Sequence, residues 1–359
     1  MPLVLAGTLL ATFAPGANAA LKSIWGPVGA FAGCGGSCFP TYAQLGVENV
    51  QFQIPWDTVA RSRPANPRDP NDPAYRWPTS GDFMVQQAAR YGISLGVLVQ
   101  GTPSWANGGL PRAWAPTNPQ DYADFMYAIS KRYPGIKRWM IWGEPNYGLN
   151  FQPMPPNSRL GPRTYAKLLD LAYGALKKAS RKNIVIGGMT ISGGGPVSTP
   201  SFVKSLRVGK GRKARPPRMD LWGHNPFDGR LPNIKRKPIG KFRGLSDIDT
   251  LHREIQRTYG LRGRVKGKKA RVPKLWLSEW TVLSEPSPNL FGGFHVSPTQ
   301  QAIYISRAYK MVRKLKYVTA LGWYRLEDEA NTGTVGAAWG LVTANGAWKP
   351  SFNAYAAAR

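Results

Sequence analysis

The chain has 359 residues, of which 42% are hydrophobic and 19% charged, so it is long and apolar enough to bury a large core. Its net charge of +29 predicts an anionic neighbour, such as an acidic polysaccharide, a cell-wall polymer or a membrane surface. No nucleic-acid-binding motif is found, and we expect no nucleic-acid partner.

Residues 1–19 are typical of a secretory signal peptide. They contain an apolar stretch from Leu3 to Phe13 and end in Ala17-Asn18-Ala19, a small-residue cleavage site before Ala20. The stretch is too short and too often interrupted by Gly and Pro to span a membrane. We therefore expect an exported protein, secreted or associated with the cell wall, that is not transmembrane.

The two cysteines lie close together in Cys34-Gly35-Gly36-Ser37-Cys38. Two thiols alone cannot build a four-ligand zinc site, and an oxidising compartment would join them as a structural disulfide. The three histidines are scattered and no acidic ligand loop is found, so we expect no metal and no organic cofactor.

Strands and helices are expected to alternate along the rest of the chain. Short apolar runs predict eight strands, near residues 24–29, 47–54, 93–99, 139–142, 183–188, 219–223, 274–278 and 319–323. Amphipathic helices are expected between them, for example at 122–133, 165–179, 247–259 and 299–315. Eight such units predict a closed (β/α)8 TIM barrel, formed by a single domain of residues 20–359. An open doubly wound sheet is the alternative, but no Gly-rich phosphate fingerprint follows the first strand.

Two of the predicted strands, the fourth and the seventh, end on glutamates, Glu144 and Glu279. The carboxyl ends of all strands in such a barrel meet at one rim, so both carboxylates would face the same cleft. A pair of carboxylates on one rim is what cleavage of a glycosidic bond requires. The alternative is two solvated glutamates at strand ends.

The same rule assigns each of three basic runs to the catalytic side of the barrel or to the opposite side. Residues 207–218 and 262–274 precede strands and are expected on the side opposite the chemistry, whereas 235–243 follows the sixth strand on the catalytic side. Each run is by default a solvated loop. The Pro-rich residues 63–78 lie between strands two and three and predict a long loop on the catalytic side.

Several motifs resemble those of clan A glycoside hydrolases, closest to family 39 and next to family 5. Trp142-Gly143-Glu144-Pro145-Asn146 is similar to their acid/base motif, and Leu275-Trp276-Leu277-Ser278-Glu279 is similar to their nucleophile segment. Further similar segments occur in the same order, namely Gly101-Thr102-Pro103-Ser104-Trp105, Trp222-Gly223-His224-Asn225-Pro226-Phe227, Gly322-Trp323-Tyr324 and Trp348-Lys349-Pro350-Ser351-Phe352. The likeness covers nearly all of the mature chain.

The resemblance implies a retaining mechanism with Glu144 as general acid/base and Glu279 as nucleophile. It also implies that Trp323 forms the floor of the sugar subsite and that His224 hydrogen-bonds near the nucleophile or a sugar hydroxyl. The alternatives are a barrel-core tryptophan and a structural histidine.

Weaker candidates for sugar contacts are Asn146, Trp105 and Trp56. Gln100 and Glu327 also follow strands, and we expect surface or structural roles for both.

Three positions depart from the family pattern. Gly143 stands where an asparagine is usual, Gln51 where an arginine is frequent, and Phe227 where a tyrosine is usual. These changes remove an amide expected to contact the sugar 2-hydroxyl, a positive charge near the nucleophile, and a hydrogen-bond donor.

The sequence therefore predicts a secreted, monomeric retaining hydrolase of an oligo- or polysaccharide, endo-acting rather than exo-acting, on an acidic or wall-associated glycan. Transglycosylation is a variant of the same chemistry. One alternative is a non-catalytic carbohydrate- or wall-binding protein on a hydrolase scaffold, favoured by the three departures. Another is a binder of anionic surfaces or of nucleic acid without sugar chemistry, which is supported only by the charge.

Overall fold

The structure is a computed structural model that describes residues 20–26, 34–260, 264–265, 268–269, 271–287, 290–329 and 336–358. Residues 1–19, where the sequence predicts a signal peptide, lie outside the described residues. Parts of the basic run 262–274 and of the expected first strand also lie outside them.

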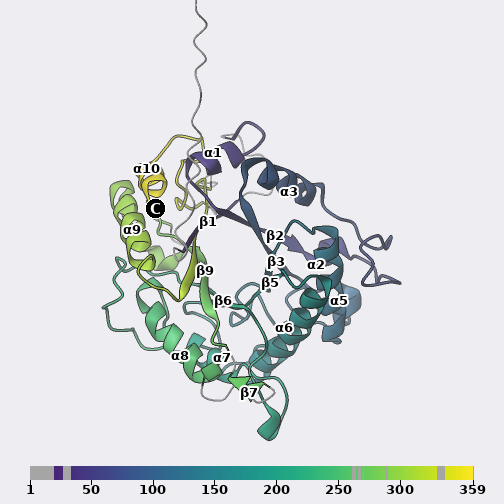
Figure 1. Ribbon diagram of the computed structural model, residues 1–359. Coiled ribbons are helices and arrows are strands. Elements are labelled where there is room, and N and C mark those ends of the chain that lie inside the picture. The colour runs from purple at the N-terminus through teal and green to yellow at the C-terminus, as the bar shows by residue number, and fades with distance from the viewer. Residues whose placement is uncertain are drawn as a thin grey trace, which may run out of the picture.

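Eight parallel strands close into a barrel, as predicted (Figure 1). Around the barrel the order is β1-β10-β9-β6-β5-β4-β3-β2, and β10 pairs with β1 to close it, with Leu21 opposite Ala320. The barrel strands are β1 (Leu21–Trp25), β2 (Asn49–Pro55), β3 (Ser94–Gln100), β4 (Arg138–Ile141), β5 (Ile184–Ile191), β6 (Leu221–Asn225), β9 (Lys274–Trp280) and β10 (Val318–Trp323).

Helices form a ring around the strands (Figure 1). They are α1 (Phe39–Gln44), α2 (Trp56–Val59), α3 (Thr79–Tyr91), α4 (Ser104–Asn107), α5 (Pro119–Arg132), α6 (Leu160–Ala179), α7 (Thr199–Ser205), α8 (Ile248–Gly260), α9 (Pro298–Val312) and α10 (Pro350–Ala357). A small antiparallel hairpin of β7 (Arg264–Val265) and β8 (Lys268–Lys269) precedes β9. Within the described residues, none of the helices has both the length and the apolarity that crossing a membrane requires.

Local sequence signals explain where two of these helices begin. The Asn118 side chain accepts a hydrogen bond from the Gln120 N–H at the start of α5, and Pro119 occupies the first turn. At α9, Ser297 and Gln300 form a reciprocal capping box, again followed by a proline. Both helices therefore begin slightly before the amphipathic pattern does.

The apolar core has two layers. A small cluster draws members from six strands and fills the barrel interior, namely Trp25, Leu98, Met140, Ile186, Met189, Trp276 and Ala320. A larger cluster lies between strands and helices, and includes Leu321 and Trp323. Because successive strand residues point to opposite faces, Ala320 faces inward while Leu321 and Trp323 face the helices.

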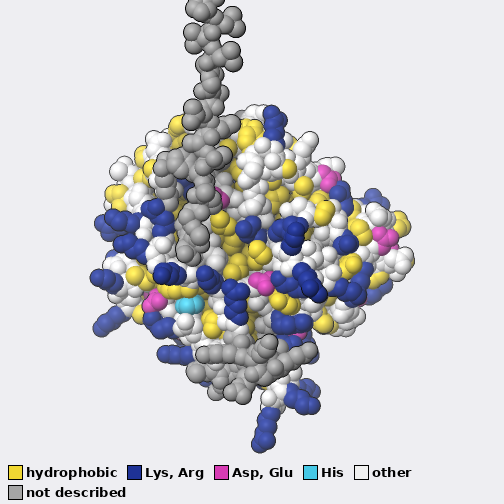
Figure 2. Space-filling model, in the orientation of Figure 1, with side chains coloured by type: hydrophobic (Ala, Val, Ile, Leu, Met, Phe, Trp, Pro, Cys, Tyr) yellow, Lys and Arg dark blue, Asp and Glu magenta, His cyan; other side chains and the backbone are white. Residues whose placement is uncertain are grey.

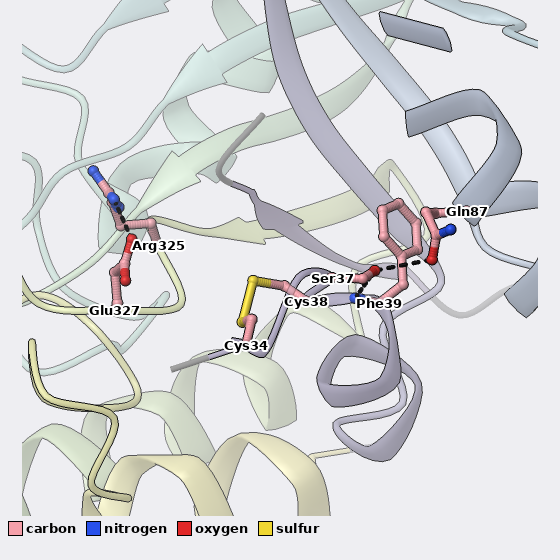
Figure 3. The surroundings of a disulfide bond; sticks show 7 residues. All are labelled: Cys34, Ser37, Cys38, Phe39, Gln87, Arg325 and Glu327. Carbon is pink, nitrogen blue, oxygen red and sulfur yellow. Dashed lines mark hydrogen bonds and ion pairs between the residues drawn. A yellow bond between two sulfur atoms is a disulfide. The ribbon is translucent and has the colours of Figure 1, made fainter. Parts of the chain in front are cut away.

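Cys34 and Cys38 form the predicted disulfide, with Cα atoms 4.8 Å apart (Figure 3). Ser37, within this loop, donates a hydrogen bond of 2.9 Å to Gln87 of α3. The disulfide loop is therefore fastened to the helical ring. Arg325 and Glu327, from the segment after β10, form an ion pair of 2.7 Å nearby, so Glu327 has a structural role.

Lys and Arg side chains cover much of the surface, as Figure 2 shows for the face viewed along the barrel. The basic run 207–218 was expected to be a solvated loop, but two of its arginines form ion pairs instead. Arg215 and Arg218 both pair with Asp170 of α6, at 2.7 and 2.9 Å. Although burial alone would raise the pKa of Asp170, these hydrogen bonds lower it to about 2.

We predict that Asp170→Asn lowers the free energy of unfolding by about 2 kcal/mol at pH 7. Because the pKa of Asp170 lies below its ordinary value of 3.8, its stabilising effect is complete above that value and disappears as the pH falls toward about 2. Urea unfolding at pH 7, 5 and 3 measures this, with the exposed Asp69→Asn as the control. A deficit that stays constant down to pH 3 would contradict the prediction.

Candidate functional site

The backbone around Glu144 has an unusual conformation. Trp142 and Glu144 have φ angles of 63° and 48°, in the left-handed region that residues other than glycine seldom adopt. The Glu144 N–H donates to the carbonyl of Met189 in β5, itself at a φ of 43°, over 2.9 Å. Such conformations persist only where surrounding structure enforces them, and they concentrate at functional sites.

Two asparagine amides hold the Glu144 carboxylate. Asn150 donates to Oε2 over 3.1 Å, and Asn225 donates to Oε1 over 2.9 Å. Glu144 is half-buried, whereas Asn225 is fully buried at the end of β6. The carboxylate is therefore fixed from two sides at the rim of the barrel.

The same Asn225 side chain also interacts with Glu279, near the end of β9. The structure thus brings Glu144 and Glu279, which come from strands on either side of β5 and β6, to one amide group. Sequence reasoning missed Asn225 because it selected the neighbouring His224. Because successive residues of a strand point to opposite faces, only one of these two side chains of β6 can point toward the barrel axis.

Burial and mutual repulsion shift both carboxyl groups in the same direction. Burial raises the pKa of Glu144, although the hydrogen bonds from Asn225 and Asn150 oppose it. Burial and then the charge of Glu144 raise the pKa of Glu279 well above its ordinary range, with Asn225 again opposing. Two such close carboxylates resist being ionised together, so the pair holds one proton over a wide pH range.

We predict that Glu144→Gln lowers the pKa of Glu279, because the neutral amide no longer opposes its ionised form. A carbon-13 NMR titration of glutamate-labelled protein measures this shift. Glu285→Gln, an exposed carboxyl on the segment after β9, is the control and should leave the titration unchanged. An unchanged pKa of Glu279 in Glu144→Gln would mean that the two groups are not in contact.

A neutral polar cluster supports the strand beneath Glu279. Gln51 of β2 donates to the Ser278 carbonyl over 2.8 Å and accepts from the Trp276 indole over 2.8 Å. The Trp25 indole also donates to the Ser278 carbonyl, over 3.1 Å. A Cβ atom on Gly322 would lie 2.0 Å from that carbonyl, so β10 can approach only with glycine there. Gln51 therefore positions the residue before Glu279 without a positive charge.

The departure at Gly143 is linked to Gln100, the last residue of β3. The Gly143 N–H donates to Gln100 Oε1 over 3.0 Å, and a Cβ atom on Gly143 would lie 2.8 Å from that oxygen. Gln100 thus occupies the space that a larger residue at 143 would need, and it holds the loop before Glu144.

Several solved structures of glycoside hydrolases have the same architecture. A family 39 glycoside hydrolase from Bacteroides cellulosilyticus WH2 superposes with a TM-score of 0.64 at 17% identity, covering 94% of this chain and 63% of that one. A glucosidase from Croceicoccus marinus gives 0.64 at 15%, covering 94% and 66%. A family 5 subfamily 18 protein from Streptomyces cattleya, solved with GlcNAc, gives 0.58 at 13%, covering 96% and 80%.

The chain has the fold of clan A glycoside hydrolases. It spans slightly less than two thirds of the length of the first two proteins. The sequence matches no family model and no curated protein. At identities this low the likeness establishes the fold alone.

The prediction that Trp323 forms the floor of a sugar subsite is wrong. Trp323 has no exposed surface and packs edge-to-face on Trp280, with ring centroids 5.4 Å apart. The neighbouring Tyr324 is half-buried, and its pKa is raised to about 12 by burial and then by the charge of Glu279. Tyr324 is therefore the aromatic residue that faces the carboxylate pair.

His224 is a structural histidine rather than a sugar contact. Its Nε2–H donates to the Arg243 carbonyl over 2.7 Å, and its Nδ1 accepts from the Thr190 hydroxyl over 2.8 Å. Burial lowers the pKa of His224 to about 4, so the ring is neutral at physiological pH. Both ring nitrogens are already used, which leaves none for a substrate.

Asn146 and Trp56 are also buried, contrary to prediction. The Asn146 side-chain oxygen Oδ1 accepts from the Ile191 N–H over 2.9 Å, which ties the loop after β4 to β5. Trp56 packs among aromatic rings, including Phe125 at 5.8 Å. Only Trp105 keeps some exposed surface, and the Arg63 guanidinium lies 4.5 Å above its ring.

Proposed function

We propose that this protein is a retaining O-glycoside hydrolase in which Glu144 is the general acid/base and Glu279 the nucleophile. The observation that best supports this is that the two carboxyl groups lie at one rim of the barrel, close enough for the charge of Glu144 to raise the pKa of Glu279. Asn225 donates to Glu144 from the strand beside β9. Carboxyl groups that act on each other in this way favour the separation of about 5–5.5 Å typical of retaining enzymes over the 6.5–9.5 Å typical of inverting ones.

In the first step Glu279 attacks the anomeric carbon while Glu144 gives its proton to the departing glycosidic oxygen. The products are a glycosyl ester on Glu279, an ionised Glu144 and a free alcohol. In the second step Glu144 takes a proton from water, whose oxygen displaces Glu279 from the anomeric carbon. Asn150 and Asn225 suit this second step in particular, because their N–H groups stabilise the ionised form of Glu144.

We also propose that the substrate is an acidic or wall-associated oligo- or polysaccharide, cleaved internally, and that the enzyme is secreted. The Cys34–Cys38 disulfide supports export, since such bonds persist in oxidising compartments. The basic run 235–243 follows β6, on the same side as both glutamates, where it would attract an anionic glycan.

A panel of 2-deoxy-2-fluoroglycosyl fluorides tests the proposal, because such reagents stall the enzyme as the glycosyl ester. We expect the intact mass to rise by one fluoroglycosyl group, and peptide mapping to place the group on Glu279. The Glu279→Gln variant should remain unlabelled. Labelling of another residue would contradict the role of Glu279. No labelling across neutral and acidic sugars would instead favour the non-catalytic carbohydrate-binding protein.

A further inference from the structure

A cavity of about 680 Å3 with a mostly apolar wall is lined by residues that end or follow β5, β6 and β9. Phe227, two residues after Asn225, and Thr281, two residues after Glu279, both line it. The cavity therefore lies at the same rim of the barrel as the carboxylate pair. The other large apolar residues of its wall are Ile191, Ile239, Phe242, Val282 and Phe294.

Two glycines allow aromatic side chains of the cavity wall to pack directly against the backbone. A Cβ atom on Gly193 would lie 2.6 Å from the Phe242 ring, and one on Gly229 would lie 3.1 Å from the Phe294 ring. At the mouth, Ile239 is 60% exposed and Phe294 37% exposed. Large apolar side chains that are exposed to solvent around a cavity indicate a binding site for an apolar group.

The loop that supplies Ile239 and Phe242 also presents four cations. Lys235, Arg236, Lys237 and Lys241 are exposed, and none of them forms an ion pair with another described residue. Arg230, which also lines the cavity, is already paired with Asp228 and Asp247. The mouth of the cavity is thus apolar within and cationic outside.

Polar groups outside this cavity lie on the strands that flank the pair. The cavity is built on β5, β6 and β9, whereas Gln100 ends β3, next to the strand that precedes Glu144, and Tyr324 follows β10, next to β9. Both are half-buried, and neither lines the cavity. The hydroxyls of a sugar ring need hydrogen-bonding partners, which these two side chains can supply. The group across the scissile bond would then enter the apolar cavity.

We propose that this cavity is a leaving-group subsite for an apolar aglycone, aromatic or alkyl, with an anionic group at its outer end. The inference rests on the proposed function, because it places the bond to the aglycone between the cavity and Glu144. It replaces the expectation of a wholly polar polysaccharide on this side of the cleft. Phe227, a departure from the family pattern, is explained as part of the apolar wall.

A dye titration tests the site without requiring turnover. The probe is 8-anilinonaphthalene-1-sulfonate, which joins an apolar ring system to one negative charge. We expect saturable fluorescence enhancement with the full chain, weakened at least tenfold by Ile239→Ser combined with Phe294→Ser. Ile303→Ser, an exposed apolar residue on α9 outside the cavity, is the matched control and should change nothing. Circular dichroism verifies that each variant is folded.

Two further comparisons separate the parts of the proposal. Lys235→Glu with Lys237→Glu should weaken the sulfonate dye but not its neutral analogue N-phenyl-1-naphthylamine. Octyl β-glucoside, below its micelle-forming concentration, should displace the dye at concentrations where methyl β-glucoside does not. Equal loss of both dyes would overturn the anionic preference.

The dye result and the trapping of Glu279 fail independently. Trapping that succeeds while the serine variants bind the dye normally would overturn the aglycone subsite and leave the hydrolase proposal intact. Dye binding that maps to the cavity while trapping fails would overturn the hydrolase proposal, and with it the role as a leaving-group subsite. An active enzyme should also lose about tenfold in kcat/KM on octyl glycosides relative to methyl glycosides in the serine variant.

Discussion

Glu279→Ala is expected to reduce turnover by roughly 10⁵-fold, because no other group would form the bond to the anomeric carbon. The same change should not lower the stability of the fold. Burial and then the charge of Glu144 raise the pKa of Glu279 well above its ordinary value of 4.5. Glu279 therefore costs the folded state stability once the pH exceeds that ordinary value, because the unfolded chain releases the proton more readily. Removing it should leave the midpoint of thermal unfolding at pH 7 equal or higher.

Steady-state kinetics and thermal unfolding of the same preparation measure both effects. Added azide should restore part of the activity by entering the space left by the carboxylate, and it would then yield a glycosyl azide of inverted configuration. A variant that is inactive and also markedly less stable would point to a structural role for Glu279. Glu285→Ala, exposed on the same side of the barrel, should be neutral in both assays.

Glu144→Ala is expected to affect substrates according to their leaving groups. Alkyl or sugar leaving groups need a proton in order to depart, so their kcat/KM should fall by about 10³–10⁴-fold. Activated aryl leaving groups depart as stable anions, so the first step should lose about tenfold or less. Their intermediate should then accumulate, because the base for the second step is missing, and kcat and KM should fall together.

The dependence of kcat/KM on the pKa of the leaving group, across a series of aryl glycosides, measures this prediction. Azide should accelerate the slow second step in the Glu144→Ala variant and give an azide product of retained configuration. That outcome is the opposite of the one expected for Glu279→Ala, so the two variants serve as controls for each other. Equal losses for every leaving group would exclude Glu144 as the acid.

The barrel was predictable because each strand is an apolar run followed by a helical pattern. The first strand is the instructive exception, since it was expected at 24–29 and lies at Leu21–Trp25. Two polar residues, Lys22 and Ser23, obscure it, although both are buried. Lys22 donates to the carbonyl of Ala358 after α10 over 2.9 Å, a partner that no local pattern reveals.

The two glutamates were placed correctly at the rim because strand ends fix the rim, but their neighbours were not. In two cases the chosen residue was one position from the residue that faces the pair, namely Trp323 instead of Tyr324 and His224 instead of Asn225. A shift of one residue turns a side chain to the other face of a strand. Register shifts occur near both positions, but the extra residue lies on the neighbouring strand, β9 in one case and β5 in the other. Alternation along β10 and β6 is undisturbed there, and it was the resemblance rather than this alternation that selected Trp323 and His224.

The neutral Gln51 beneath Glu279 has a consequence for how the proposed activity would respond to ionic strength. None of the described lysines or arginines forms an ion pair with Glu144 or Glu279. The charge of the pair is therefore limited by the proton that the two carboxyl groups share and not by a neighbouring cation. In the proposed cycle the pair holds one negative charge before glycosyl transfer, on Glu279, and one afterwards, on Glu144. Dissolved salt would therefore act on the capture of anionic substrates by the cationic surface, and leave the bond-breaking step almost untouched.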